Sequence, residues 1–132
     1  MFRSQSLTPY LLLGRVSNLP TVWTNTLAGS VLAGSDVGPG RLVLLALAFS
    51  LLYTGGMYLN DAFDRESDAR ERPERPIPSG RIGAGTVFAI GFGLLVAGIL
   101  GVATVAGGPS GGGLVAVASG VLLAGVITAY DA

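Results

Sequence analysis

The charged residues of this chain are concentrated in one short segment, and this distribution restricts the folds that it can adopt. Eleven of its sixteen charged residues lie within 61–81. Three long stretches, 16–35, 42–60 and 82–130, contain no charged residue, and Asp36 and Arg41 lie between the first two. A helix that crosses the hydrocarbon core of a bilayer needs roughly 20 apolar residues. The pattern therefore predicts an integral membrane protein with several membrane-spanning segments.

Turns rich in glycine and proline divide the chain into helices. They lie at 35–40, 73–80 and 107–113, and such clusters interrupt helical segments. The expected fold is therefore all-α, a multi-pass transmembrane bundle with about four helices in this chain. The predicted helices are residues 9–33, 41–69, 82–106 and 114–131.

The placement of arginine predicts the orientation of these helices. All eight basic residues are arginines, and the two predicted outer turns hold only Arg41. Cytoplasmic loops of membrane proteins carry an excess of basic residues. We therefore expect the N-terminus and the acidic, arginine-rich loop 61–81 to face the cytoplasm from the inner, or cell, membrane. The arginines of that segment are Arg65, Arg70, Arg72, Arg75 and Arg81.

Small residues recur at four-residue spacing in the last two predicted helices. Such stripes allow membrane helices to approach closely, and we expect them to form packing faces. The two stripes are Ala89, Gly93, Ala97 and Gly101, and Ala116, Gly120, Ala124 and Thr128.

The composition limits the chemistry that this chain can perform. It contains no cysteine and no histidine, which excludes disulfides, thiol catalysis and the usual general base. A metal would have to be held by oxygen atoms, which favours a hard cation such as Mg²⁺. Acidic and basic residues balance to a net charge of zero, so net charge does not indicate any class of partner. For a chain of membrane-spanning segments we expect the lipid bilayer as surroundings and no nucleic-acid partner.

The acidic segment places four oxygen-bearing side chains on one side of a helix. At 100° per residue they fall within about a quarter of the circumference. Three carboxylates this close repel one another unless a divalent cation lies among them. Mg²⁺ usually binds one or two carboxylates together with substrate phosphates, so the arrangement predicts a magnesium–diphosphate site. Its candidate metal ligands are Asn60, Asp61, Asp64 and Asp68.

Two arginines follow this acidic face closely. Arg72 and Arg75 lie in a proline-rich loop, and the planar guanidinium suits phosphate oxygens. The alternative is a solvated helix surface with ion pairs at four-residue spacing. The alternating charges of residues 64–74 are also compatible with that interpretation.

The segment from Asn60 to Gly80 resembles the first aspartate-rich motif of the UbiA superfamily of intramembrane prenyltransferases. The resemblance rests on Asn60-Asp61-x-x-Asp64-x-x-x-Asp68 and on Arg75-Pro76-Ile77-Pro78-Ser79-Gly80. The spacing is most similar to that of the chlorophyll synthase and archaeal geranylgeranylglyceryl phosphate branches. The first predicted helix, with Arg15, Asn18 and Ala28-Gly29, resembles the family more loosely.

The resemblance implies an enzyme that transfers a prenyl group from a prenyl diphosphate to an aromatic or other lipid-soluble acceptor, with Mg²⁺. It implies that Asp61, Asp64 and Asp68 are catalytic and that, with Asn60, they hold the metal. Residues implied to contact the diphosphate are Asn60, Arg72, Arg75 and, from the first helix, Asn18.

The chain also departs from the family pattern. Family members have a second aspartate-rich motif, and here Asp131 is the only acid after Glu74. We therefore expect a fragment, the N-terminal part of a UbiA-like domain, that is inactive without the missing C-terminal half or a partner chain.

Two other functions fit parts of this pattern. CDP-alcohol phosphatidyltransferases also carry aspartates at a helix end, but they require a glycine directly after Asp-x-x-Asp, where this chain has Arg65. A small non-catalytic membrane scaffold or subunit with a charged cytoplasmic loop remains the alternative.

Overall fold

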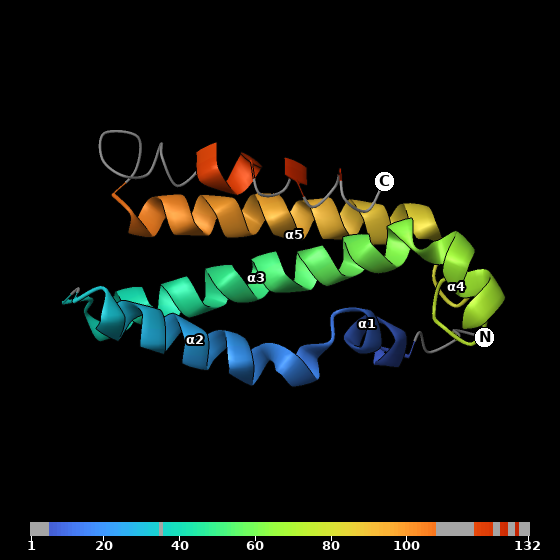
Figure 1. Cartoon of the computed structure of the whole chain (residues 1–132), viewed down its shortest axis with the longest axis horizontal. Coiled ribbons are helices and arrows are strands. Elements are labelled where there is room, and N and C mark those ends of the chain that lie inside the picture. The colour runs from blue at the N-terminus through green and yellow to red at the C-terminus, as the bar shows by residue number, and fades with distance from the viewer. Residues whose placement is uncertain (1–5, 35, 108–117, 123–124, 127–128, 130–132) are drawn as a thin grey trace.

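The computed structural model describes residues 6–34, 36–107, 118–122, 125–126 and 129. Every regular element among these residues is a helix, as the predicted all-α class requires (Figure 1). In chain order the elements are α1 (Thr8–Leu13), a 3-10 turn η1 (Val16–Asn18), α2 (Leu19–Leu32), α3 (Pro39–Phe63), α4 (Arg65–Glu71) and α5 (Ala84–Val105).

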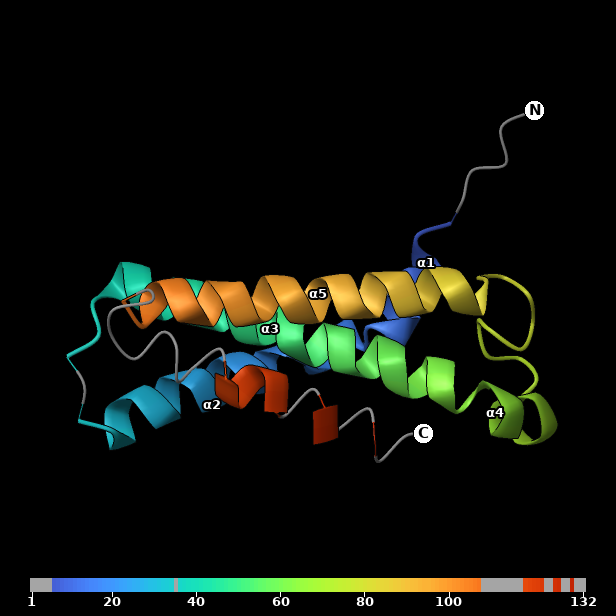
Figure 2. The same ribbon diagram turned by 90° about the horizontal axis from the view of Figure 1, so that it is seen from above.

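Two of the helices are long and apolar enough to cross a membrane. The most apolar windows of α3 and α5 have mean hydropathies of 1.9 and 2.3, and only 22% and 28% of these windows are buried. A core helix of a soluble protein would be mostly buried. The two helices run antiparallel, side by side, and α2 lies along the other side of α3 (Figures 1 and 2).

Glycines allow α3 and α5 to approach closely. A Cβ atom on Gly55 of α3 would lie 2.8 Å from the carbonyl oxygen of Gly91, and one on Gly98 would lie 2.9 Å from the carbonyl oxygen of Ala48. Real Cβ atoms are not found this close to other heavy atoms, so each glycine is needed for the observed backbone separation. The interface is therefore built on close backbone contact, as is typical of membrane helices.

The small-residue stripe predicted on α5 is not the face that packs against α3. Ala89, Gly93 and Ala97 are exposed, and a Cβ atom added to Gly93 would meet nothing within 4 Å. Of the predicted stripe only Gly101 contacts α3, where a Cβ would lie 3.0 Å from Ala48. Because α5 is apolar on all sides, its sequence does not indicate which face is buried. In the second predicted stripe, Ala116, Ala124 and Thr128 lie outside the described residues.

The predicted helix 9–33 is also corrected, because the structure breaks it into α1, η1 and α2. Gly14 packs against α3, where a Cβ atom would lie 3.0 Å from Thr54 Cγ2. The next residue, Arg15, has a left-handed backbone with φ of 44°. Pro20 then occupies the first turn of α2, where its missing N–H is tolerated. With 14 residues, α2 is shorter than the roughly 20 residues of a typical span.

The other predicted helices agree better with the structure. The predicted helix 41–69 is divided at Asp64 into α3 and α4, although hydrogen bonds from Asp64 N to Asn60 O and from Asp68 N to Asp64 O nearly continue the helix. The predicted helix 82–106 corresponds to α5 within two residues. Of the predicted helix 114–131, residues 118–122, 125–126 and 129 are helical, and its other residues lie outside the described part of the chain.

A cluster of buried apolar side chains joins α1, α3 and α5 near the end that carries α4. Its members are Leu13, Tyr58, Ala62, Ile82 and Val87. The hydroxyl of Tyr58 also donates a hydrogen bond of 2.9 Å to the backbone oxygen of Tyr10. This cluster fixes the helix ends that position the acidic residues.

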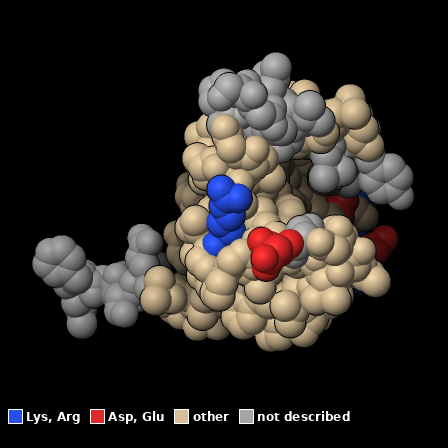
Figure 3. Space-filling view, turned by 90° about the vertical axis from the view of Figure 1, so that its left-hand side faces the viewer, with Lys and Arg blue, Asp and Glu red and all other residues tan. Residues whose placement is uncertain are grey.

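The opposite end of the molecule is almost uncharged. Viewed from that end, the near surface shows a basic and an acidic side chain close together among uncharged residues, and further acidic atoms are visible only behind it, at the right edge (Figure 3). Among the described residues at this end, Asp36 lies in the turn before α3 and Arg41 in the first turn of α3.

Candidate functional site

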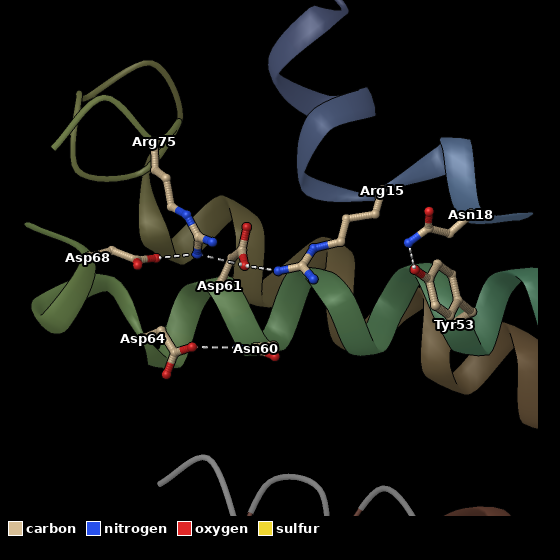
Figure 4. Close-up of polar contacts among 8 residues, drawn as sticks. All are labelled: Arg15, Asn18, Tyr53, Asn60, Asp61, Asp64, Asp68 and Arg75. Atoms are coloured by element: carbon tan, nitrogen blue, oxygen red, sulfur yellow. Dashed lines mark hydrogen bonds and ion pairs between the residues drawn. The ribbon is translucent and has the colours of Figure 1, made fainter. Parts of the chain in front are cut away.

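Two buried carboxylates and one guanidinium form the centre of the charged end. Asp61 lies in the last turn of α3 and Asp68 in α4, and each is 7% exposed. Nη1 of Arg75 donates a hydrogen bond of 2.7 Å to Asp68 Oδ2 and lies 3.4 Å from Asp61 Oδ1 (Figure 4). A single nitrogen atom thus contacts both carboxylates.

The proline-rich loop holds Arg75 in place. Its backbone N–H bonds to the oxygen of Arg72, and its own oxygen accepts from the N–H of Ser79. Pro76 is buried and its oxygen accepts from Ile82 of the apolar cluster. Burial disfavours the charged guanidinium, but its hydrogen bond to Asp68 and the surrounding aspartates raise the pKa of Arg75 above its ordinary value. Arg75 therefore stays protonated at any physiological pH.

A second arginine reaches the same carboxylate from the other side. Nη2 of Arg15 lies 3.6 Å from Asp61 Oδ1 (Figure 4). Arg15 is the one non-glycine residue with positive φ in the described part of the chain. This conformation costs roughly 1–2 kcal/mol for a residue with a side chain. The break between α1 and α2 thus carries a strained residue whose side chain pairs with Asp61.

Sequence reasoning did not include Arg15 among the site residues. The available signal was an arginine within an otherwise apolar segment, because such a residue in a membrane protein usually faces a partner or a cavity.

The four predicted metal ligands are arranged as two pairs rather than one set. Asn60 Nδ2 donates a hydrogen bond of 2.6 Å to Asp64 Oδ2, away from Asp61 and Asp68 (Figure 4). No group of three or more acidic side chains positioned to hold a metal occurs among the described residues. Helix geometry explains the division: on an ideal helix Asp61 and Asp68 fall about 20° apart, and Asn60 and Asp64 lie to one side of them.

The two other predicted diphosphate residues lie apart from this centre. The side-chain amide of Asn18 donates a hydrogen bond of 3.0 Å to the hydroxyl of Tyr53, which precedes Asp61 by about two turns of α3. Arg72 follows α4 and is exposed, with no ion pair among the residues that the structure describes. Both arginines follow the acidic face in the sequence, and the sequence pattern gives them the same predicted role. In the structure Arg75 contacts the buried carboxylates, whereas Arg72 makes no such contact among the described residues.

The chemistry of the donor set fits Mg²⁺. Asp61 and Asp68 offer carboxylate oxygens, and Asn60 and Asp64 carry further oxygens in a separate pair directed away from them. Hard cations of this kind take oxygen ligands. The bridging position of Arg75 shows that one positive centre can contact both buried carboxylates.

Comparison with known proteins gives a consistent result. The model of the UbiA prenyltransferase family matches residues 22–131. Digeranylgeranylglyceryl phosphate synthase of Metallosphaera sedula is 32% identical over 93 residues, which are 70% of this chain and 33% of that protein. The protein of the same name from Ignicoccus hospitalis is 39% identical over 100 residues, 76% of this chain and 32% of its own length. The chain thus spans about a third of the length of these relatives.

A solved structure of digeranylgeranylglyceryl phosphate synthase in membranes has a similar fold. It superposes with a TM-score of 0.79 and 25% sequence identity, covering 95% of this chain and 43% of the solved one. The family match over most of the sequence, together with this fold, shows that the chain belongs to the UbiA prenyltransferase family.

Proposed function

We propose that this chain provides the diphosphate-binding part of a Mg²⁺-dependent membrane prenyltransferase. The observation that carries the proposal is the pair of buried carboxylates, Asp61 and Asp68, at the end of an apolar helix long enough to span a bilayer. Buried carboxylates are rare unless they are paired or hold a metal. The prenyltransferase relatives support the same conclusion.

In this proposal Asp61, Asp64 and Asp68, with Asn60, hold Mg²⁺ and through it the diphosphate of a prenyl donor. The metal, when bound, neutralises charge on the leaving diphosphate. Arg75 and Arg15, which already pair with Asp61, are near enough to contact diphosphate oxygens and stabilise the same charge. Arg72 is exposed and could approach from the solvent side, whereas Asn18 would first have to leave Tyr53.

The acceptor in this proposal is a lipid-soluble molecule within the bilayer. The relatives from Metallosphaera sedula and Ignicoccus hospitalis are named for a glyceryl phosphate with two geranylgeranyl groups. A geranylgeranylglyceryl phosphate is therefore the first acceptor to test, with an aromatic acceptor as the comparison.

The facing part of the site is proposed to come from additional polypeptide. This chain spans about a third of the length of its relatives, and its described residues contain a single acidic cluster. The 132-residue chain alone is expected to bind Mg²⁺ and diphosphate but to transfer no prenyl group. Magnesium-dependent transfer by the purified chain would contradict this part of the proposal.

Binding of inorganic pyrophosphate tests the site in the chain itself. Detergent-solubilised protein should bind pyrophosphate measurably by calorimetry only when Mg²⁺ is present. Asp61→Asn should weaken this binding at least tenfold, because it removes one of the two buried carboxylates proposed to hold the metal. Glu66→Gln is the matched control, since Glu66 is exposed and pairs only with Arg65 among the described residues.

Activity in the full-length parent protein separates an enzyme from a scaffold. Asp64→Asn and Asp68→Asn should abolish prenyl transfer if these residues hold the metal. A non-catalytic scaffold or subunit would tolerate both substitutions, and the parent protein would show no magnesium-dependent transfer with either acceptor.

A further inference from the structure

Arg75 occupies the position where a cation bound by Asp61 and Asp68 would have to lie. Its Nη1 atom is 2.7 Å from one carboxylate and 3.4 Å from the other. Both carboxylates are almost fully buried, and the Arg75 side chain is 23% exposed. Without a positive group between them, the two buried negative charges would repel each other and lack solvation.

A divalent cation and this guanidinium cannot both occupy that position. Like charges repel strongly at contact distance in a partly buried site, so Mg²⁺ can bridge the two carboxylates only if Arg75 moves away. The contact of Arg15 with Asp61 is longer, at 3.6 Å, and the Arg15 side chain is 42% exposed. Arg15 therefore competes with the metal much less than Arg75 does.

Once displaced, Arg75 needs another anion, because it remains protonated and partly buried. The prenyl donor brings one, since its diphosphate group is anionic and binds a guanidinium in a planar fork. The loop that carries Arg75 is fixed by its backbone hydrogen bonds, so a change of side-chain rotamer is enough to exchange one partner for the other.

We propose that Arg75 is a positioning residue that couples the two ligands: it neutralises Asp61 and Asp68 in the ligand-free protein, and it admits Mg²⁺ only when a diphosphate is present to accept its guanidinium. This inference rests on the proposed function, and it adds a binding order to it. Metal alone binds weakly, and metal and diphosphate strengthen each other's binding by the same factor.

The test measures metal binding in the absence of any diphosphate. Free Mn²⁺, a spectroscopic substitute for Mg²⁺, is titrated by electron paramagnetic resonance into the detergent-solubilised full chain. Arg75→Gln is expected to bind Mn²⁺ alone about tenfold more tightly than the unsubstituted protein, a typical size for coupling between two ligands. Binding of pyrophosphate at saturating Mg²⁺ is expected to weaken in the same variant by a similar factor.

Arg70→Gln is the matched control for a general effect of charge. It removes one arginine from the same acidic region, but Arg70 is exposed and has no ion pair among the described residues. Its Mn²⁺ affinity should change less than twofold. If Arg75→Gln binds Mn²⁺ no more tightly than Arg70→Gln, the coupling role is wrong and Arg75 is only a structural counter-ion or a diphosphate ligand.

A second variant keeps the test decisive if Arg75→Gln does not fold. Arg75→Lys retains the charge, but its ammonium ends one bond short of the Nη1 atom that contacts both carboxylates, and it should bind Mn²⁺ alone about threefold more tightly than Arg70→Gln. No gain in this variant would also overturn the inference. Failure of the unsubstituted protein to bind pyrophosphate with Mg²⁺ is a different result, because it would reject the proposed function itself.

Discussion

Asp64 and Asp68 lie four residues apart on a nearly continuous helix, but their surroundings differ. Asp68 is buried and accepts a 2.7 Å hydrogen bond from Arg75, whereas Asp64 is exposed and bonds to Asn60. A buried, charge-assisted bond contributes to stability because breaking it leaves a poorly solvated partner. An exposed polar contact contributes little, because water replaces it. Site residues with the same proposed ligand therefore differ in structural importance.

Substitution by asparagine should reveal this difference in stability. Asp68→Asn is expected to lower the free energy of unfolding by about 2 kcal/mol, because Arg75 loses its closest anionic partner. Asp64→Asn should change it by less than about 0.5 kcal/mol. Circular dichroism during titration with sodium dodecyl sulfate in mixed micelles measures both values. Equal losses of stability would show that the burial of Asp68 has no energetic consequence.

At the scale of elements, the pairing of α3 with α5 fixes the position of the charged end. Gly55 of α3 faces α5, where a Cβ would meet the oxygen of Gly91 at 2.8 Å and the backbone nitrogen of Leu95 at 3.1 Å. The adjacent Gly56 has open space around the same position. The two neighbours thus differ only in which side of α3 they occupy.

Alanine substitutions at these neighbours should therefore have opposite effects. Gly55→Ala is expected to destabilise the protein by about 1–3 kcal/mol, because backbone atoms cannot move aside as a flexible side chain can. Gly56→Ala should be neutral or stabilising by up to about 1 kcal/mol, since alanine is the better helix former. Detergent unfolding of the two variants measures the contrast. Destabilisation of the same size at both positions would mean that α3 and α5 do not pack through this face.

At the scale of the whole molecule, charge divides the protein into two ends. Residues 61–81 lie at the end of α3, in α4 and in the loop before α5, with Arg15 beside Asp61, and Asp36 and Arg41 lie at the opposite end, where α3 begins. Figure 1 shows these two ends of the molecule. We propose that α3 crosses the membrane with its α4 end in the cytoplasm, because five arginines follow it there.

Single-cysteine labelling tests this orientation directly, since the chain contains no cysteine of its own. In intact cells that express the protein, Asp36→Cys should react with a membrane-impermeant maleimide. Ser67→Cys, exposed in α4, should react only after the membrane is permeabilised. The reverse pattern would invert the orientation, and labelling of both from outside would show that α3 does not span the bilayer.

The sequence alone was enough to predict the features that depend on local composition. Uncharged stretches of sufficient length predict α3 and α5, and prolines and glycines predict the breaks near 35–40 and 73–80. The acidic motif followed by Arg75-Pro76 identifies the family. These features could be predicted because hydrophobicity, the missing N–H of proline and motif spacing are properties of neighbouring residues.

Only the tertiary structure decided which residues meet. An entirely apolar helix has no amphipathic pattern to indicate its buried face, so α3 determined that α5 packs through Gly91 and Gly98 rather than Gly93. Gly14 packs against α3, and Arg15, the left-handed residue that follows it, has its side chain paired with Asp61. The loop places Arg75, and not Arg72, between Asp61 and Asp68. These contacts join residues that are far apart in sequence, and their geometry depends on how whole helices pack together.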